Sequence, residues 1–313
     1  MGFKKYKKFF ERRLGRYGLL FSFLIFRILP GKSIYGFADF VAKLGFVIAG
    51  KKRKHALESL NIAFGKEKDS KELKQIALAS FEYMARGILE LLYLIEHPHL
   101  ISRKVSIEGK GNLDKAIAEG KGVICVTAHF GNFPLMLFKF ACDGYKTNCI
   151  MRIMRDQQVE DIFNKKRTDA GIGTIYSQPR PECINKSLKA LRNNELLFIQ
   201  LDQNFGTGGV FVDFFGTKAA TATGPVIFAM RTGAPILPMF MVRNRDNTHK
   251  MIIEPVLHLE EKATREETIV VNVSRITKII EAYIRKYPEE WGWIHRRWKS
   301  RPTKETMAGR PVS

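Results

Sequence analysis

The residue best placed to do chemistry is His129, which follows a short apolar run, residues 122–126. A short β-branched run bounded by glycine predicts a buried strand, and His129 lies where that strand turns into a helix. Ligands of α/β sheets bind at the carboxyl ends of strands, and imidazole serves as an acid or base near neutral pH. His129 is therefore the best candidate for a catalytic base, although an isolated histidine at a strand end is more often a hydrogen-bonded structural residue.

A second group of polar residues follows another apolar run, residues 195–201. An acid and two amides come first, and three glycines follow within the next five positions. Glycine lets a backbone approach a ligand closely, and the N–H groups of such a loop can hold an anion or a developing oxyanion. An ordinary loop that the acid caps is the alternative. The residues are Asp202, Gln203, Asn204, Gly206, Gly208 and Gly209.

Other polar side chains are suited to an anionic substrate. Thr223 precedes Gly224 and Pro225 at the start of an apolar helix, and a helix start rich in free N–H groups can hold a phosphate or carboxylate. Arg152 ends a predicted strand and Arg167 lies on the following helix. Guanidinium groups there can clamp a phosphate with two hydrogen bonds; a solvated charged face is the alternative.

The elements that must position these residues alternate between strand and helix in the second and third thirds of the chain. Such alternation predicts an α/β domain, residues 55–301, with a mixed, mostly parallel central sheet flanked by helices. We expect strands at 122–128, 146–152, 195–201, 209–213, 235–242 and 250–256. We expect helices at 55–64, 69–96, 112–119, 132–142, 157–170, 181–193, 222–232 and 265–286.

The formal net charge is +21, from 52 basic and 31 acidic residues. This excess indicates a polyanionic partner, which is a nucleic acid, an anionic membrane surface or a phosphorylated substrate. No zinc-ligand spacing, aromatic RNA-binding strand or helix-turn-helix pattern is present, so we expect no nucleic-acid partner. The four cysteines form no C-x-x-C pair. Because Cys125 and Cys142 lie in apolar runs and Cys149 borders one, we expect reduced core thiols, with no disulfide and no metal site.

The first 54 residues predict a helical membrane anchor. Basic residues precede the apolar stretch 17–26, and a second basic cluster at residues 51–54 follows the segment 31–50. The stretch 17–26 is shorter than the roughly 20 apolar residues that span a bilayer, and Arg27 and Pro30 interrupt its continuation. Aromatic-rich amphipathic segments between basic clusters are typical of an anchor in the membrane interface. A single tilted span that includes Arg27 and a buried helical hairpin are the alternatives.

All three tryptophans lie between residues 291 and 298, beside His295, Arg296 and Arg297. Cation–π stacking or a membrane-interface belt would explain this cluster, and a structural role in closing the domain is the alternative. Residues 302–313 contain two prolines and a glycine and predict a loose tail.

Several separated motifs occur in a fixed order along the chain. They are Leu57-Glu58-Ser59-Leu60-Asn61 after the basic cluster, His129-Phe-Gly-Asn, Asp202-Gln-Asn-Phe-Gly, Phe211-Val-Asp-Phe-Phe-Gly with the following Ala-Thr-x-Thr-Gly, and Trp293-Ile-His-Arg-Arg-Trp-Lys. Together they resemble the bacterial lipid A late acyltransferases of the lauroyl/myristoyltransferase type, within the wider glycerolipid acyltransferase superfamily. The resemblance runs from the N-terminal anchor to Trp298.

This resemblance implies an acyltransferase on the cytoplasmic face of the inner membrane that needs no metal or other cofactor. A fatty acyl chain would move from acyl carrier protein or acyl-CoA to a hydroxyl of a lipid A precursor or related anionic lipid. The basic surface would hold the acidic membrane and attract the acidic carrier protein. His129 would remove the proton of the hydroxyl. We expect substrate binding by Asn132, Arg152, Arg167, Gln203, Asn204, Gly206 and Thr223.

The chain departs from the family pattern at the acid that orients the histidine. The family pairs its histidine with an acid in a His-x4-Asp/Glu motif, and here Pro134 stands in the place of the acid. A histidine without such a partner has no fixed tautomer and is a weaker base. We expect Asp202 or Asp213 to act as a substitute catalytic acid, with Asp143 less favoured. The alternatives are a thiol leaving group that needs little base assistance, and a catalytically weak or inactive lipid-binding homologue.

The resemblance also leaves the acceptor open. A lysophospholipid, another glycolipid or an ornithine-type lipid would likewise present a hydroxyl or amine near anionic groups.

Overall fold

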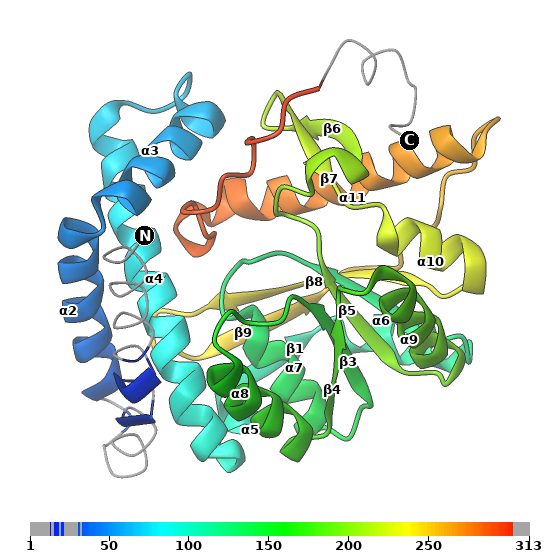
Figure 1. Cartoon of the computed structure of the whole chain (residues 1–313), viewed down its shortest axis with the longest axis horizontal. Coiled ribbons are helices and arrows are strands. Elements are labelled where there is room, and N and C mark those ends of the chain that lie inside the picture. Colours follow the sequence, from blue (N-terminus) through cyan, green and yellow to red (C-terminus); the bar gives the residue numbers. More distant parts are fainter. Residues whose placement is uncertain (1–12, 14–15, 19, 22–30, 32, 303–313) are drawn as a thin grey trace, which may run out of the picture.

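A seven-stranded sheet forms the centre of the structure (Figure 1). The computed structural model describes residues 13, 16–18, 20–21, 31 and 33–302. The strands are β1 (Val105–Glu108), β2 (Val123–Thr127), β3 (Thr147–Met151), β4 (Ile172–Tyr176), β5 (Leu196–Gln200), β6 (Val210–Phe214), β7 (Thr217–Thr221), β8 (Ile236–Arg243) and β9 (His249–Ile253).

The central sheet has the order β1-β9-β8-β2-β5-β3-β4. The strands β8, β2, β5, β3 and β4 are parallel to one another, whereas β9 is antiparallel to β8 and β1 is parallel to β9. The predicted mixed, mostly parallel sheet is therefore confirmed.

Three strands were not predicted from the sequence. Two of them, β1 and β4, form the edges of the central sheet and carry partly exposed residues, so they lack the apolar runs of the inner strands. The third, β7, pairs with β6 in a separate two-stranded antiparallel sheet. The predicted strand at 209–213 belongs to this small sheet, outside the central one.

All eight predicted helices are present, and two begin with a capping box. Asp69 and Glu72 cap the helix that begins at Ser70, and Thr264 and Glu267 cap the one that begins at Arg265. The α-helices are α2 (Ser33–Ile48), α3 (Gly50–Phe64), α4 (Ser70–Glu96), α5 (Ile101–Lys104), α6 (Lys110–Ala118), α7 (Phe133–Cys142), α8 (Gln157–Asp169), α9 (Arg180–Arg192), α10 (Gly224–Thr232) and α11 (Arg265–Lys286).

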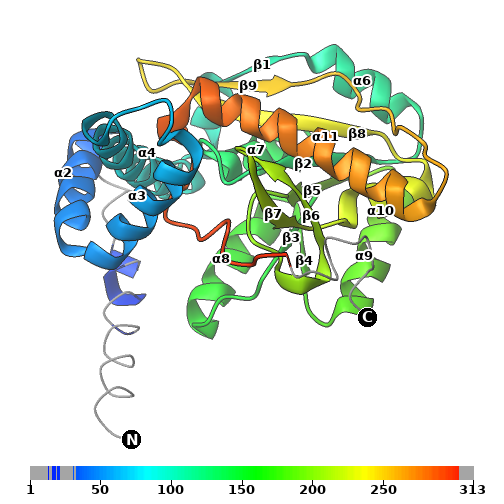
Figure 2. The ribbon, with the colours of Figure 1, turned by 90° about the horizontal axis from the view of Figure 1, so that it is seen from above.

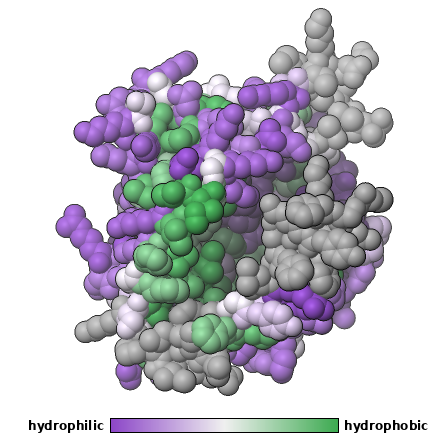
Figure 3. All heavy atoms as spheres, turned by 60° about the vertical axis from the view of Figure 1, so that its left-hand side comes forward, coloured by the Kyte–Doolittle hydropathy of each residue, from purple (hydrophilic) through white to green (hydrophobic). Residues whose placement is uncertain are grey.

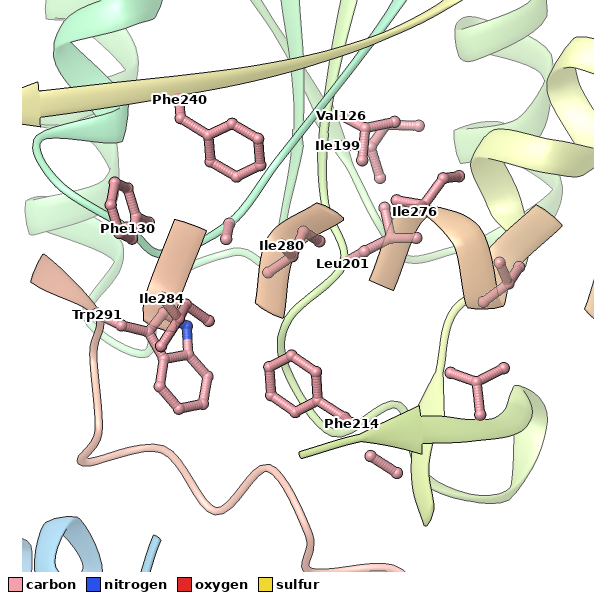
Figure 4. Close-up of a cluster of buried hydrophobic side chains, with 14 of the residues drawn as sticks. Val126, Phe130, Ile199, Leu201, Phe214, Phe240, Ile276, Ile280, Ile284 and Trp291 are labelled. Atoms are coloured by element: carbon pink, nitrogen blue, oxygen red, sulfur yellow. The ribbon is translucent and has the colours of Figure 1, made fainter. Parts of the chain in front are cut away.

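Helices cover both faces of the sheet, so its central strands β8, β2 and β5 are buried on both sides. All five residues of β2 are buried. Because side chains alternate along a strand, Ile124 and Val126 join the cluster that contains α11, whereas Val123 and Cys125 join the cluster that contains α6 and α7. Figure 4 shows the first cluster, in which side chains of α11 at four-residue intervals meet the sheet and Phe214 of β6.

The helices α2, α3 and α4 are grouped beside the sheet (Figures 1 and 2). One face of α2 is buried, with Ile34, Ala38, Ala42 and Phe46 at four-residue intervals. Its other face is exposed and apolar. The exposed large side chains of α2 are Phe37, Phe40, Val41, Leu44, Val47 and Ile48.

Among the described residues, no single helix is both long and apolar enough to cross a membrane, and only the bent pair α2–α3, with 90° between its helices, has the length and composition when taken together. The expected boundary at residue 54 falls inside α3, whose Ala56 and Leu60 join the main core. Arg27, on which the tilted-span alternative depends, lies outside the described residues, as do residues 303–313 of the predicted tail.

The structure corrects two expectations about buried residues. Cys125 and Cys149 are buried free thiols, but Cys142 is exposed because it ends α7 on the solvent side. The three tryptophans are all buried, between 0% and 5% exposed. They therefore help to close the domain, and the membrane-interface belt is wrong.

Candidate active site

His129 and Asp202 meet because β2 and β5 are neighbouring parallel strands. Their register pairs Thr127 with Gln200, so the residues two positions further on come together where both strands end. His129 Nδ1 lies 2.9 Å from Asp202 Oδ1, and the backbone N–H of His129 donates to Asp202 Oδ2 at 2.9 Å. Of the acids that the sequence offered, Asp202 is the one in contact with the imidazole.

Asp202 is a buried carboxylate, with its side chain 1% exposed. The indole N–H of Trp291 donates to Asp202 Oδ2 at 2.7 Å. Burial by itself would raise the pKa of Asp202, but the charge of His129 and the hydrogen bonds from His129 and Trp291 lower it to about 2. An ionised carboxylate accepts a hydrogen bond from Nδ1–H of the imidazole, and in the neutral form of the ring this leaves the lone pair on Nε2.

The second ring nitrogen of His129, Nε2, faces the side-chain amide of Gln203. Gln203 Nε2 lies 2.9 Å from His129 Nε2 and 3.5 Å from His295 Nε2. The two imidazole rings are 5.3 Å apart, centroid to centroid. Burial, followed by the charge of His129, lowers the pKa of His295. Two imidazoles thus converge on one amide group, and the position of that amide is where a hydroxyl would have to lie to give its proton to His129.

The turn after His129 requires glycine. Gly131 has φ +57°, and a Cβ atom there would come within 1.9 Å of the carbonyl oxygen of Met241. Its N–H donates to the carbonyl oxygen of Glu290 at 2.8 Å, and Phe130 forms a β-bridge with Trp291. The turn is thereby fixed to both β8 and the segment after α11, which holds His129 in place.

A cavity of about 520 Å³ opens beside His129. This volume lies within the range of about 300–1,000 Å³ that is typical of small-molecule sites. The walls are mostly aliphatic and aromatic, and they come from α4, α7, β3, α8 and the end of β5 with the loop that follows it. The apolar lining includes Ile88, Leu91, Leu92, Ile95, Phe133, Pro134, Leu137, Phe138, Cys149, Ile150 and Met151.

A second cavity, of about 250 Å³, lies on another side of His129. It shares Phe133 and Pro134 with the larger cavity and is also lined by Tyr83 and Glu290. The Glu290 carboxylate is 5% exposed and accepts the backbone N–H of Arg243. Burial raises the pKa of Glu290 to about 8, so the carboxyl group is mostly protonated at neutral pH.

Asn132 connects the histidine turn to a buried polar network. Its amide donates to Glu90 Oε2 at 3.1 Å and to the carbonyl oxygen of Gly87. Glu90 also accepts from Arg243 and His249, each at 2.7 Å, and from Tyr35 at 2.5 Å. Asn132 lines the smaller cavity, but its amide already donates to Glu90 and Gly87. Besides the substrate-binding role expected for it, Asn132 therefore has a structural role in this network.

Three charged residues that the sequence singled out differ in their surroundings. Arg152 is exposed and lines the larger cavity. Arg167 also lines this cavity, but it is buried and its guanidinium forms an ion pair with Glu160 at 2.6 Å. Asp213 accepts the backbone N–H of Gly216 at 3.0 Å in the β6–β7 turn, and no contact joins it to His129 among the described residues.

Asn204 and Gly206 follow β5, and Thr223 lies between β7 and α10. Asn204 lines the larger cavity and exchanges two hydrogen bonds with Ser300. Gly206 has φ +77° and open space where a side chain would be, whereas Gly209 packs against the backbone of β7 and is needed there for close approach. Thr223 precedes α10 without capping it through its side chain.

Sequence reasoning missed four residues of the site region. Trp291 and His295 lie in the tryptophan-rich segment, which the sequence marked as unusual without indicating a role for either residue. Glu90 is an acid on the apolar face of α4, and Glu290 follows a helix end. A buried acid between apolar positions is a usable signal for a polar network, because an isolated buried charge is costly.

Within the ranges that the structure describes, no three His, Cys, Asp or Glu side chains gather as a group able to hold a metal ion. Asp202 contacts the ring of His129, whereas the ring of His295 faces the amide of Gln203.

The comparisons with known proteins agree with the motif order. The family model for bacterial lipid A biosynthesis acyltransferases matches residues 5–300. The chain is 26% identical over 260 residues to the lipid A biosynthesis palmitoleoyltransferase of Escherichia coli K12, covering 80% of each protein. It is 24% identical over 283 residues to the lauroyltransferase of the same organism, covering 88% of each.

One mycobacterial relative is named for a different acceptor lipid. The phosphatidylinositol mannoside acyltransferase of Mycobacterium tuberculosis H37Rv is 28% identical to this chain over 137 residues, which is 42% of each protein. The match of the family model over nearly the whole chain decides the assignment. The chain belongs to the bacterial lipid A biosynthesis acyltransferase family, and it is an acyltransferase.

Proposed function

We propose that this enzyme transfers a fatty acyl chain from a thioester donor to a hydroxyl of a lipid A precursor or a related anionic lipid, with His129 as general base. The observation that carries the proposal is the contact between His129 and the ionised Asp202 beside a large apolar cavity. The names of the bacterial relatives support the acceptor class.

The proposed reaction uses the two nitrogens of His129 differently. Nδ1–H donates to Asp202, so Nε2 takes the proton of the acceptor hydroxyl as its oxygen attacks the thioester carbonyl. The negative charge of Asp202 stabilises the imidazolium that forms. When the C–S bond of the tetrahedral intermediate breaks, the departing sulfur takes this proton, which leaves an ester and a free thiol.

Asp202 would take the place of the acid that is missing at Pro134. Pro134 lines both cavities beside the histidine turn, and it has no side-chain acid to offer. The neighbouring strand β5 provides one instead, because the strand register brings Asp202 to the imidazole. This arrangement supports an active enzyme over an inactive lipid-binding homologue.

Gln203 must move before the hydroxyl can react. Its amide lies at hydrogen-bond distance from the lone pair of His129 Nε2, so the hydroxyl and the amide compete for the same position. Gln203 is exposed, and an exposed side chain can change rotamer at little cost. We therefore infer that Gln203 lies where the acceptor lipid binds.

The larger cavity suits the acyl chain of the donor, because its walls are apolar and it reaches His129. The donor would be acyl carrier protein or acyl-CoA, both of which carry acyl groups as thioesters. The strongly basic chain would attract either of these anionic donors.

The exposed face of α2 supports a location at a membrane surface, and we assign it to the cytoplasmic side of the inner membrane, where the family resemblance places the enzyme. Its six large apolar side chains form part of a hydrophobic area flanked by hydrophilic residues (Figure 3). Exposed apolar areas bordered by polar residues mark interaction sites, including membranes. An amphipathic helix of this kind would lie in the interface of the membrane, with lysine and arginine close to the anionic lipid headgroups.

Mass spectrometry tests the proposal at the level of the product. Lipids from cells that lack this gene, and from cells in which it has been restored, would differ by one acyl chain on the true acceptor. Purified enzyme with an acyl-carrier donor should acylate the lipid A precursor. Acylation of only a lysophospholipid or a phosphatidylinositol mannoside would reject the proposed acceptor, and no acyl transfer to any of the three would reject the proposed activity.

A further inference from the structure

A basic cavity lies between α3 and the segment that follows α11. Its volume is about 490 Å³. The walls are His55, Glu58, Ser59, Asn61, Ile62, Arg296, Trp298, Lys299 and Arg301. Three of these nine residues are cations from one short segment, and we call them the basic triplet: Arg296, Lys299 and Arg301.

Among residues 33–302, no carboxylate pairs with the basic triplet. All three side chains are exposed, and among the residues that the structure describes none of them forms an ion pair. The single acid of the cavity, Glu58, already faces His55 at 3.3 Å and Lys54 at 4.0 Å. An excess of positive charge therefore remains in the cavity for a ligand.

The positions of Arg296 and Arg297 differ although they are adjacent in sequence. Arg297 is 0% exposed and donates to the carbonyl oxygens of Gln203 and Ala220. It therefore holds the loop after β5 in place. Arg296 is exposed and lines the cavity. Arg297 thus has a structural role in the fold, whereas Arg296 is available to a ligand.

The basic cavity is close to the proposed base. Arg296 follows His295, whose Nε2 lies 3.5 Å from the amide of Gln203, and that amide is 2.9 Å from His129 Nε2. The hydroxyl of Ser59, from the cavity wall, donates to the carbonyl oxygen of His295 at 3.4 Å. A substrate with its reacting group at His129 could therefore place a second group in the basic cavity.

We propose that the basic triplet binds a phosphate group of the substrate whose reaction takes place at His129. Two arginines and a lysine suit a phosphate, since its several oxygens accept from two guanidinium forks and an ammonium together. This inference rests on the proposed function, because it assumes a substrate at His129. The phosphate belongs either to the acceptor lipid or to the phosphopantetheine of the donor.

Direct binding tests the cavity without any acyl transfer. Calorimetric titration of the full-length protein with inorganic pyrophosphate at low salt should show binding that weakens by about ten-fold or more in R296Q/K299Q/R301Q, since several charge-assisted hydrogen bonds are lost. The matched control is R180Q/K189Q/R192Q, which removes the same charge from exposed positions on α9. Equal binding by both triple variants, or no binding by the wild type, would overturn the proposal.

Steady-state kinetics then identify the source of the phosphate. If it belongs to the acceptor, R296Q/K299Q/R301Q should raise the KM for the phosphorylated lipid and not for its dephosphorylated form. If it belongs to the donor, the variant should raise the KM for the carrier-bound thioester and not for an N-acetylcysteamine thioester, which has no phosphate. Unchanged KM values in every arm would overturn the link to the substrate. If the protein bound pyrophosphate through the basic triplet but transferred no acyl group, the proposed function would be rejected. The phosphate site itself would still be supported.

Discussion

The molecule contains two histidine–carboxylate contacts that have similar lengths and different surroundings. His129 Nδ1 lies 2.9 Å from Asp202, and His249 Nε2 lies 2.7 Å from Glu90. The side chain of His129 is 26% exposed, whereas that of His249 is 0% exposed. The second nitrogen of His129 faces Gln203 beside a cavity, whereas the second nitrogen of His249 is buried and has no hydrogen-bond partner in the described part of the chain.

A short distance between imidazole and carboxylate does not by itself make a catalytic pair. Burial lowers the pKa of His249 despite the opposing effect of Glu90, and this disfavours the charged form of the ring. Arg243 provides the charge that balances Glu90. In the other pair, the cavity gives a substrate access to the basic nitrogen. Access to the second nitrogen therefore separates the proposed base from the structural histidine.

Asp202→Asn should give the largest effect on activity. The variant keeps the shape of the side chain but loses the charge that fixes the tautomer of His129 and stabilises its imidazolium. We expect kcat for acyl transfer to fall by about 10³–10⁴-fold, as for other catalytic histidines that lose their carboxylate. The measurement is product formation from carrier-bound thioester and lipid acceptor. A fall of less than ten-fold would show that Asp202 is not the orienting acid.

Glu90→Gln should affect stability far more than chemistry. It leaves the buried guanidinium of Arg243 without its counter-charge, and breaking a buried pair costs about 3–5 kcal/mol of unfolding free energy. Denaturant unfolding at neutral pH measures this loss, and kcat per folded molecule should stay within a few-fold of the wild type. If E90Q lost activity as D202N does while remaining stable, the contrast between the two pairs would be wrong.

The pH dependence of stability should distinguish the paired carboxylates from Glu290. The pKa of Glu90 is lowered to about 2, because His249, Arg243 and Tyr35 outweigh the raising effect of burial. Its stabilisation is present above the unfolded pKa of about 4.5 and is lost as the pH falls toward 2. Burial instead raises the pKa of Glu290 to about 8, so this group destabilises the fold increasingly as the pH rises from about 4.5 to 8.

Glu290→Gln should therefore make the fold more stable at pH 8 and leave it nearly unchanged at pH 4.5. Thermal unfolding midpoints of the variant and the wild type across this window measure the effect. A difference between the two proteins that stayed constant with pH would show that Glu290 has an ordinary pKa.

Substitutions at Gln203 should change activity less than Asp202→Asn does, and they test access to His129. Gln203→Ala removes the competing amide, and we expect kcat/KM to stay within a few-fold of the wild type. Gln203→Glu places a carboxylate beside Nε2, favours the protonated ring and should lower activity by about ten-fold or more. Both variants are assayed at neutral pH against the same donor. Equal activities would mean that the side chain does not face the reacting nitrogen.

The sequence predicted the central elements of the fold well because their side chains are apolar on both faces. Buried strands such as β2 and β5 have continuous apolar runs, and glycine or polar residues mark their ends. The edge strands β1 and β4 were missed because edge positions need fewer apolar residues. Cys142 was assigned to the core because its run is apolar, but position along the helix decides which residue of such a run is exposed.

For the site, the sequence identified His129 and Asp202 but offered no way to choose between Asp202 and Asp213. That choice depends on which strands are neighbours, and strand order is a long-range property that no local pattern contains. The ion pair between Arg167 and Glu160 could not be predicted from the sequence for a different reason. Both residues lie on α8 seven positions apart, and only the three-dimensional packing around Thr174 and Tyr176 shows that the pair is buried.

The most direct test of the central claim is the kcat of His129→Gln with carrier-bound thioester and lipid acceptor, measured beside His249→Gln. The proposed role predicts that H129Q retains a thermal midpoint close to that of the wild type and loses at least about 10³-fold in kcat, as expected for the loss of a catalytic base. It predicts the reverse pattern for H249Q, with a lower midpoint and kcat per folded molecule within a few-fold of the wild type. Acyl transfer by folded H129Q at a rate within ten-fold of the wild type would contradict the assignment of His129 as the base.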